Sequence, residues 1–463
     1  MNDIKGEPGL RLRMHRVHVV ERGRRARRGY VRCEIDRHLI FDTERLETYC
    51  LASWDEKVYD AFVLAAAVQF CDHTKKRPSA SWGRHIVLQV PVHDPDLWNA
   101  KSVSEALHDA LQFLTGDRWD IAFTRIREPV KPLRQGNLRM PGGPCAVIPY
   151  SEGLDSRAVA GLAALDQSRE VIRVRLGSKR LNGCGDKRQP FAAVPYSVGL
   201  DNKARSVESS GRSRGFKFAL LSGIAAVLSG ADKVIVPESG QGALGPVLVP
   251  AGQAYEDYRN HPLFTDRMEK FIYALFGHTV CYSFPRLWYR KGETLARFAT
   301  ECPDGAHWRQ TRSCWQGSRQ VSVSGKMRQC GICAACLLRR MSVHAMGMTE
   351  PAESYVWGDL SAERFEDGKA PGFKLKKLDG AQYQYAIAGT LHLDHLAGLL
   401  QTRGSDVALD RQVCQLGQSL GLPEEEVRSK LTRLLNKHEE EWRSFLNTLG
   451  PKSFVARWAR GGQ

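Results

Sequence analysis

Residues 145–156 have the sequence Cys145-Ala-Val-Ile-Pro-Tyr-Ser-Glu-Gly-Leu-Asp-Ser156, which predicts a short buried strand followed by a tight loop. The next residues, 157–165, are mostly small and predict a helix. Backbone N–H groups at the start of such a helix point at a bound anion, and the helix dipole adds favourable charge. The stretch therefore predicts a phosphate-binding loop between a strand and a helix.

The side chains of this loop suit that chemistry. Gly153 lets the backbone approach a ligand closely. The hydroxyls of Ser151 and Ser156 can donate hydrogen bonds to phosphate oxygens, and Asp155 can hold Mg²⁺. The loop lacks the Gly-Lys-Ser/Thr ending of a Walker loop. From the loop alone, a strand–turn–helix that binds nothing stays open as the alternative.

Strands and helices alternate after the loop. Residues 171–176 and 233–236 have the apolar pattern of buried strands, and residues 215–228 have that of a core helix. Such alternation is typical of a doubly wound parallel sheet with helices on both faces. We therefore expect an α/β domain over residues 145–350.

Four cysteines near the end of this domain have the spacing of a zinc site: Cys314, Cys330, Cys333 and Cys336. Two cysteines separated by two residues grip one metal from a tight turn, and here that step occurs twice in succession. Four thiolates complete a tetrahedral Zn²⁺ site and leave no position for water, so we expect a structural role. The alternative is a set of four buried free cysteines.

The chain has 463 residues, enough for two or three domains. Residues 1–140 are expected to form an α+β module without a catalytic motif. Its expected strands lie at 17–21, 30–35, 86–92 and 119–126, and its expected helices at 56–70 and 102–114. Prolines and glycines over 129–144 predict a linker to the α/β domain.

The C-terminal residues 371–463 are charged and are expected to be helical. Apolar residues recur at helical spacing over 392–400, 406–420 and 423–446. Nothing in these residues indicates chemistry. We expect the helices to cover the core or to meet a partner.

The sequence also predicts the compartment. Eight of the twelve cysteines lie outside the predicted zinc site and are scattered, which fits a reducing cytoplasm better than a disulfide framework. The first residues lack the apolar segment of a secretory signal. No apolar run approaches the roughly 18 residues that a membrane helix needs. We expect a cytoplasmic protein without a membrane segment, and the oligomeric state stays open.

The net charge is +16, and the excess is concentrated in two places. One group lies near the N-terminus and comprises Arg11, Arg13, Arg16, Arg22, Arg24, Arg25, Arg27 and Arg28. The other follows the predicted nucleotide loop and comprises Lys179, Arg180, Lys187, Arg188, Lys203, Arg205, Arg212, Arg214 and Lys217. Such groups attract nucleic acid, an acidic protein or the phosphates of a nucleotide. A solvated basic surface is the alternative for the N-terminal group.

The loop Ser151-Glu-Gly-Leu-Asp-Ser156 resembles the Ser-Gly-Gly-x-Asp-Ser motif of the PP-loop ATP pyrophosphatases, which split ATP between its α and β phosphates. The departure is Glu152, where that family usually has glycine. A carboxylate beside pyrophosphate is electrostatically unfavourable, so Glu152 would weaken or retune ATP binding.

Together with the cysteines, the loop resembles the 7-cyano-7-deazaguanine synthase family, QueC. That family ends with a cysteine, a short insertion and then a Cys-Gly-x-Cys-x-x-Cys-x-x-Arg segment. The matching residues here are Cys314, Cys330, Gly331, Cys333, Cys336 and Arg339. Further similar segments are Val236-Pro-Glu238, Lys291-Gly-Glu293-Thr294 and the arginine Arg214 before a core helix. The chain is much longer than a minimal member. Its additional parts resemble the QueC-like proteins of bacterial anti-phage operons, in particular those of the Qat defence system.

This resemblance implies an ATP-dependent enzyme that adenylates a carboxylate similar to that of 7-carboxy-7-deazaguanine, for amide or nitrile formation or for transfer to an amine. It implies ATP, Mg²⁺ and Zn²⁺ as bound groups and other defence-operon proteins as partners. The implied catalytic residues are Asp155, Lys291 and Glu238. The implied nucleotide-binding residues are Ser151, Glu152, Gly153, Leu154, Asp155 and Ser156. The implied substrate-binding residues are Arg214, Glu238 and Glu293.

Two other classes stay open. A PP-loop enzyme that modifies tRNA would suit the basic N-terminus, and it would need a reactive cysteine, for which Cys184 is the candidate. A catalytically inactive nucleotide-binding scaffold in a defence complex would suit the Glu152 departure. Conversion of ATP to AMP separates these classes.

Overall fold

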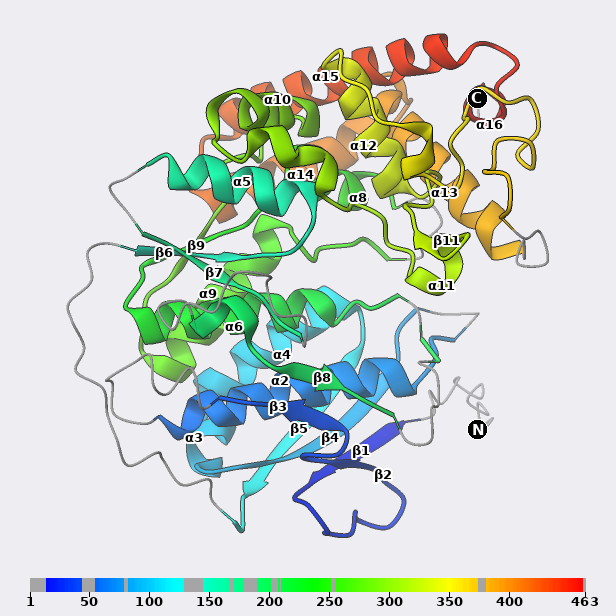
Figure 1. Cartoon of the computed structure of the whole chain (residues 1–463). Helices are drawn as coiled ribbons and strands as arrows, with labels where there is room; N and C mark the ends of the chain where they lie inside the picture. The colour runs from blue at the N-terminus through cyan, green and yellow to red at the C-terminus, as the bar shows by residue number, and fades with distance from the viewer. Residues whose placement is uncertain are drawn as a thin grey trace, which may run out of the picture. The chain divides into compact units, whose positions relative to one another are not determined.

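The structure is a computed structural model, shown in Figure 1. It describes residues 14–43, 55–78, 82–128, 145–166, 170–177, 190–200, 207–208, 210–250, 255–373 and 380–460. The chain divides into two compact units. Unit 1 comprises residues 1–142, 174–234 and 264–281, and unit 2 comprises residues 143–173, 235–263 and 282–463. Both units are discontinuous in sequence, and the contiguous boundaries near residues 140, 350 and 371 stay predictions.

Unit 1 contains a four-stranded sheet with the order β2-β1-β4-β5. Its strands are β1 (His15–Val20), β2 (Val31–Glu34), β4 (His85–Val92) and β5 (Arg118–Arg125). The four strands confirm the predicted positions. The expected α+β arrangement needs one correction, because all three pairs in this sheet are parallel. Helical crossovers precede β4 and β5, and such connections return the chain to the same end of the sheet.

The helices of this unit confirm the predicted pattern. Helix α2 (Glu56–Thr74) begins after Asp55, whose carboxylate accepts a hydrogen bond from the Lys57 N–H at 2.9 Å. It is buried on nearly all sides, as a helix lying between a sheet and a further helix must be. The other helices of unit 1 are α3 (Pro95–Asn99), α4 (Lys101–Thr115), α6 (Arg214–Ser229) and most of α9 (Pro262–Phe276). The short strands β3 (Leu39–Phe41) and β8 (Tyr196–Val198) form an antiparallel pair.

Buried charges join the elements of unit 1. The Arg84 guanidinium lies 2.7 Å from Asp72 and 2.6 Å from Asp117, and Arg77 lies 2.7 Å from Asp117. Asp72 also accepts a hydrogen bond from the N–H of Ser213 at the start of α6. Each carboxylate therefore faces a cation, which offsets the cost of removing it from water.

A second four-stranded sheet has the order β10-β9-β6-β7. Its strands are β6 (Cys145–Pro149), β7 (Glu170–Val174), β9 (Lys233–Ile235) and β10 (Cys281–Ser283). The first three confirm predicted strands. The predicted helix after β6 is α5 (Leu154–Ala164), and it begins three residues earlier than expected because the extended Gly153 is its N-cap. The chain leaves β6 through α5 to β7 on one side and later returns to β9 on the other.

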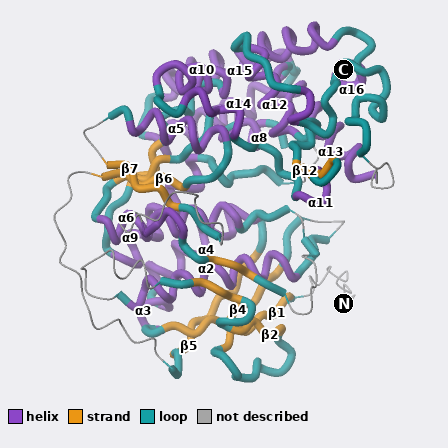
Figure 2. Tube along the Cα trace, viewed as in Figure 1, coloured by secondary structure: helices purple, strands orange, loops and turns teal. Residues whose placement is uncertain are grey.

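The rest of unit 2 is mainly helical, as Figure 2 shows. Helix α15 (Glu424–Leu449) and helix α14 (Ser405–Leu420) lie where the sequence predicts them. Helix α13 (Gly380–Ala397) begins well before the predicted residue 392. The longer helices that precede these are α10 (Lys291–Glu301) and α12 (Ala334–Ala345). The remaining elements are α7 (Gly240–Ala243), α8 (Gly245–Leu248), α11 (Ser318–Val321), α16 (Phe454–Arg460), β11 (Ser322–Val323) and β12 (Lys326–Met327).

Helix α15 explains why the C-terminal residues fold against this unit. Its buried residues include Val427, Leu431, Leu434 and Leu435, which recur every three or four positions and form one apolar stripe. This stripe belongs to a core cluster that also contains Leu287 and Ala243. None of the helices in the described parts of the chain is long and apolar enough to cross a membrane.

Candidate functional site

The loop after β6 is ordered by hydrogen bonds of its own hydroxyls. Ser151 Oγ accepts a hydrogen bond from the Gly153 N–H at 3.1 Å and donates one to Ser156 Oγ at 3.0 Å. No side chain caps the N-terminus of α5, so its first N–H groups are available to an anion. Leu154 is buried and anchors the first turn, whereas Glu152 is exposed.

Asp155 and Lys291 form an ion pair beside this loop. The ammonium group of Lys291 contacts Asp155 Oδ2 and is almost fully buried. The second carboxylate oxygen, Asp155 Oδ1, is also buried, and it has no hydrogen-bond partner within the part of the chain that the structure describes. Two residues that lie far apart in the sequence are therefore brought together, and their catalytic role stays a prediction.

Glu238 joins this pair from the segment after β9. Its Oε2 accepts a hydrogen bond from Asn260 Nδ2 at 3.1 Å. Burial and the nearby Asp155 carboxylate raise the pKa of Glu238 to about 8, while Lys291 acts in the opposite direction. Gly242 leaves room for this arrangement, because a Cβ at this position would force the Glu238 carboxylate to move.

The place where these residues meet follows from the sheet order. Strand β6 has β7 on one side and β9 on the other, and the chain visits these sides in turn. In sheets of this kind, ligands bind beyond the carboxyl ends of the strands at the point where the order reverses. The loop 151–156 follows β6 and Glu238 follows β9, so both lie at that point.

Glu293 and Arg214 have other surroundings. Glu293 caps α10 by accepting the Arg290 N–H at 2.8 Å, and it also pairs with the guanidinium of Arg433 at 3.1 Å. Burial disfavours its charged form, but the hydrogen bonds from Arg290 and the charges of Arg290 and Arg433 together outweigh this and lower the pKa of Glu293. Arg214 begins α6 in unit 1, where its guanidinium lies 5.4 Å from the centre of the Phe218 ring. Substrate binding by either residue stays a prediction.

The four predicted zinc ligands form a cluster in unit 2. The sulfur atoms of Cys314, Cys330, Cys333 and Cys336 all lie within 4.8 Å of one another. Backbone N–H groups point at two of them: the Cys330 N–H lies 3.1 Å from Cys314 Sγ, and the Cys333 N–H lies 3.3 Å from Cys330 Sγ. Gly331 has φ +86°, which the tight turn between Cys330 and Cys333 requires.

The chemistry of this cluster suits Zn²⁺. Four thiol groups at these separations match the tetrahedral all-sulfur sites that zinc prefers. Hydrogen bonds among the thiols hold the pKa of Cys314 well below its usual value, whereas burial raises the pKa of Cys336. A bound metal ion would replace this shared-proton arrangement with four metal–thiolate bonds, so the residues fit the ion.

Arg339, the arginine of the cysteine motif, ties the cluster to its surroundings. It is fully buried on α12 and donates hydrogen bonds to Glu350 at 2.8 Å and to Thr311 Oγ1 at 2.7 Å. The neighbouring Arg312 N–H donates to the carbonyl of Glu152 at 2.8 Å. The segment that leads into Cys314 is thus bonded both to α12, which carries Cys336, and to the predicted nucleotide loop.

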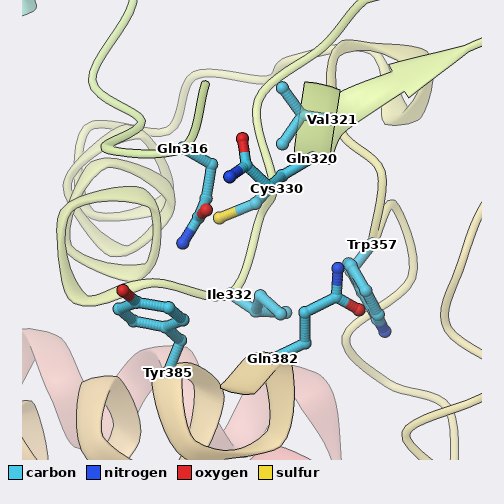
Figure 3. A pocket seen from close by; sticks show the side chains of 8 residues that line it. All are labelled: Gln316, Gln320, Val321, Cys330, Ile332, Trp357, Gln382 and Tyr385. Atoms are coloured by element: carbon cyan, nitrogen blue, oxygen red, sulfur yellow. The ribbon is translucent and has the colours of Figure 1, made fainter. Parts of the chain in front are cut away.

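A small hollow lies beside the cysteine cluster (Figure 3). It is lined by the apolar side chains of Val321, Ile332 and Trp357, by Cys330, by the carboxamides of Gln316, Gln320 and Gln382 and by Tyr385. None of the residues in the Asp155–Lys291–Glu238 group lines it. This hollow is therefore distinct from the candidate catalytic site.

Sequence reasoning missed three residues of the site: Asn260, Gly242 and Gln241. Gly242 and Gln241 lie in Glu238-Ser-Gly-Gln-Gly242, where the repeated glycines signal close backbone approach. Asn260 carries no such signal. The predicted reactive cysteine, Cys184, lies outside the described residues.

The chain matches no protein-family model and no curated protein. The resemblance to the QueC family therefore rests on the motifs quoted above.

The first prediction concerns the cysteine cluster. Cys333→Ser should lower the zinc content to well under one ion per chain and should reduce the yield of folded protein, because metal binding at such sites contributes directly to folding. Zinc is measured by elemental analysis and folding by the melting temperature. Cys414→Ser is the control, since this thiol lies on α14 outside the cluster. A wild-type protein without zinc contradicts the assignment.

The second prediction uses the raised pKa of Glu238. The folded state binds the proton of the Glu238 carboxyl more tightly than the unfolded chain does. The stability that this proton contributes is fully present below pH 4.5 and is lost as the pH rises through about 8. Glu238→Gln keeps an acceptor for Asn260 and does not titrate. Its melting temperature relative to wild type should therefore increase between about pH 5 and about pH 9. An offset that does not change with pH would show that the Glu238 pKa is ordinary.

Proposed function

We propose that this chain is a QueC-like ATP-dependent enzyme that adenylates the carboxylate of a deazapurine-like substrate. The observation that carries the proposal is the meeting of Asp155, Lys291 and Glu238 beside the uncapped N-terminus of α5, at the point where the strand order reverses. The cysteine cluster supports it as the second element of the same motif combination.

The reaction needs an activated acyl group. An oxygen of the substrate carboxylate attacks the α-phosphorus of ATP, the bond from that phosphorus to the bridging oxygen breaks, and pyrophosphate leaves. An amine then attacks the acyl carbon and AMP leaves. The α5 N–H groups and the Ser151 and Ser156 hydroxyls would hold the pyrophosphate, and Lys291 would offset its charge.

Asp155 is the residue that would hold Mg²⁺. Its Oδ1 is buried and has no donor among the described residues, which is the state expected of an oxygen that binds a cation. The bound ion would neutralise phosphate charge. Glu152, the departure from the family motif, is exposed, which is compatible with a pyrophosphate seated on the loop backbone.

Glu238 suits the recognition of a purine-like ring. In its ionised form a carboxylate accepts two hydrogen bonds, which matches the ring N–H and amino group of a guanine-like edge. Asn260 fixes one of its oxygens and Gly242 leaves room beside the other. Binding of two donors would lower the pKa of Glu238, because hydrogen bonds to the charged form stabilise it.

The third prediction tests the adenylation. Asp155→Ala and Asp155→Asn should lower AMP release from ATP by about 10²–10³-fold, because a transition-state charge loses its partner. AMP is measured by chromatography with a deazaguanine carboxylate and ammonia present. Asp304→Ala, an exposed carboxylate of the same unit, is the control. Equal AMP release by wild type and the Asp155 variants would refute the role of Asp155. If the wild-type protein releases no AMP, the chain is better explained as an inactive scaffold.

We also propose that the N-terminal arginines dock an acidic partner, a defence-operon protein or a nucleic acid. The connection between β1 and β2 carries the exposed residues Arg22, Arg24, Arg25, Arg27 and Arg28. Arg24 lies 3.2 Å from Glu128, but this pair is exposed and screened by water, so it contributes little to stability. Arg11 and Arg13 lie outside the described residues.

The fourth prediction tests this surface. Reversal of Arg24, Arg25, Arg27 and Arg28 to glutamate should abolish co-purification with the operon-encoded partner and phage protection. The negative charges of an acidic partner would then face negative charges and be repelled. Wild-type binding should weaken with rising salt. Arg403→Glu with Arg411→Glu, which reverses two exposed arginines of unit 2, is the control. Binding that survives the fourfold reversal refutes the electrostatic role.

A further inference from the structure

A buried network of polar side chains lies next to the candidate site, between α7, the start of α10 and α15. Gln241, on α7 just after Glu238, accepts a hydrogen bond through Oε1 from the backbone N–H of Lys291 at 2.9 Å. Its Nε2 lies 2.9 Å from Nδ1 of His438 on α15. One carboxamide thus connects the segment after β9, the start of α10 and the long C-terminal helix.

The protonation of His438 is determined by its neighbours. Its Nε2 lies 2.9 Å from the carbonyl oxygen of Leu393, which can only accept, so Nε2 carries the hydrogen. Nδ1 is then an acceptor for the Gln241 amide. Burial lowers the pKa of His438 to about 4, so the ring is neutral in this arrangement. Each hydrogen bond in this chain therefore has one possible donor: His438 donates to Leu393, Gln241 donates to His438, and the Lys291 N–H donates to Gln241.

Glu441, one helical turn further along α15, closes the network on its other side. Its Oε1 lies 2.9 Å from the guanidinium of Arg290, and its Oε2 lies 3.4 Å from Gln241 Nε2. Burial raises the pKa of Glu441 to about 7 in spite of Arg290. Gly292 packs directly against this carboxylate, and a Cβ there would lie about 3.2 Å from Glu441 Oε1, a tight contact. The N-terminus of α10 is thus held at Arg290, Lys291 and Gly292.

Apolar packing alone would not require these groups. Core residues on α15 already bury it against unit 2, and buried polar groups add cost unless each one is paired. Hydrogen bonds differ from apolar contacts because they specify direction and register. This network fixes the backbone of Lys291, the residue whose side chain meets Asp155.

We propose that His438 and Glu441 are positioning residues for the candidate site: through Gln241 and Arg290 they set the start of α10 so that Lys291 reaches Asp155. The C-terminal helical residues, for which the sequence indicates no chemistry, would then complete the active site. This inference rests on the proposed adenylation for its kinetic readout. Its structural readout rests on the hydrogen bonds of Gln241 and His438 and on the ion pair between Arg290 and Glu441.

The fifth prediction compares four variants. His438→Leu and Glu441→Leu should lower kcat for AMP release by about 10–100-fold with the KM for ATP nearly unchanged, because a small displacement of a reacting group costs rate more than binding. His438→Gln can accept from Gln241 and donate to Leu393, so it should restore much of kcat. The control is Trp442→Phe, which removes a buried hydrogen bond between α15 and Asp394 without touching Gln241.

A second readout does not depend on turnover. Hydrogen exchange at residues 290–295, followed by mass spectrometry, should speed up in His438→Leu and Glu441→Leu and should stay unchanged in Trp442→Phe. All variants are compared at matched distance below their melting temperatures.

The outcomes separate the two proposals. If wild type releases AMP and the variants keep its kcat, the positioning role is wrong while the proposed function stands. If wild type releases no AMP, the proposed function fails, and the exchange experiment alone decides the positioning role. Unchanged exchange at the start of α10 in both leucine variants overturns the inference in either case.

Discussion

The structure of the candidate site depends on one electrostatic constraint: two carboxylates lie close together beside one buried cation. Asp155 contacts Lys291 directly. The charges of both residues act on the Glu238 carboxylate: Asp155 raises its pKa and Lys291 lowers it. Two partly buried carboxylates with one lysine cannot both ionise without cost, and burial together with the Asp155 carboxylate raises the pKa of Glu238 to about 8. A bound cation or a ligand with hydrogen-bond donors would relieve that constraint.

The scaffold supplies this arrangement from separate elements. The parallel sheet places the ends of β6 and β9 at one edge, and α10 begins there after the segment that follows β10. Gly242 leaves room for one carboxylate, and Gln241 bonds the Lys291 backbone. Helix α15 contacts the same region through His438, which lies beside Gln241, and through Glu441, which pairs with Arg290. The residues that contact one another thus come from four separate segments of the chain.

The cysteine cluster is connected to this site through a short path. Arg312 bonds the carbonyl of Glu152 in the loop, and Cys314 lies two residues further along. Arg339 on α12 holds the same segment through Thr311. A metal ion that fixes Cys314 would therefore also fix the backbone of the loop, which gives a structural metal an effect on the predicted nucleotide site without any role in chemistry.

The sequence by itself determined the features that depend on neighbouring residues. The strand and loop at 145–156, the amphipathic spacing of α15 and the Cys-x-x-Cys-x-x-Cys turn are local patterns, and the structure contains each of them. The tertiary structure alone decided which residues meet. Lys291 reaches Asp155 across 136 positions, and Gln241 reaches His438 across 197. Glu293 pairs with Arg433 across 140 positions, and the substrate contact that the resemblance implies for it stays a prediction. Such pairings leave no local signature, because a side chain's partner is set by where the helices and strands pack and not by its neighbours along the chain.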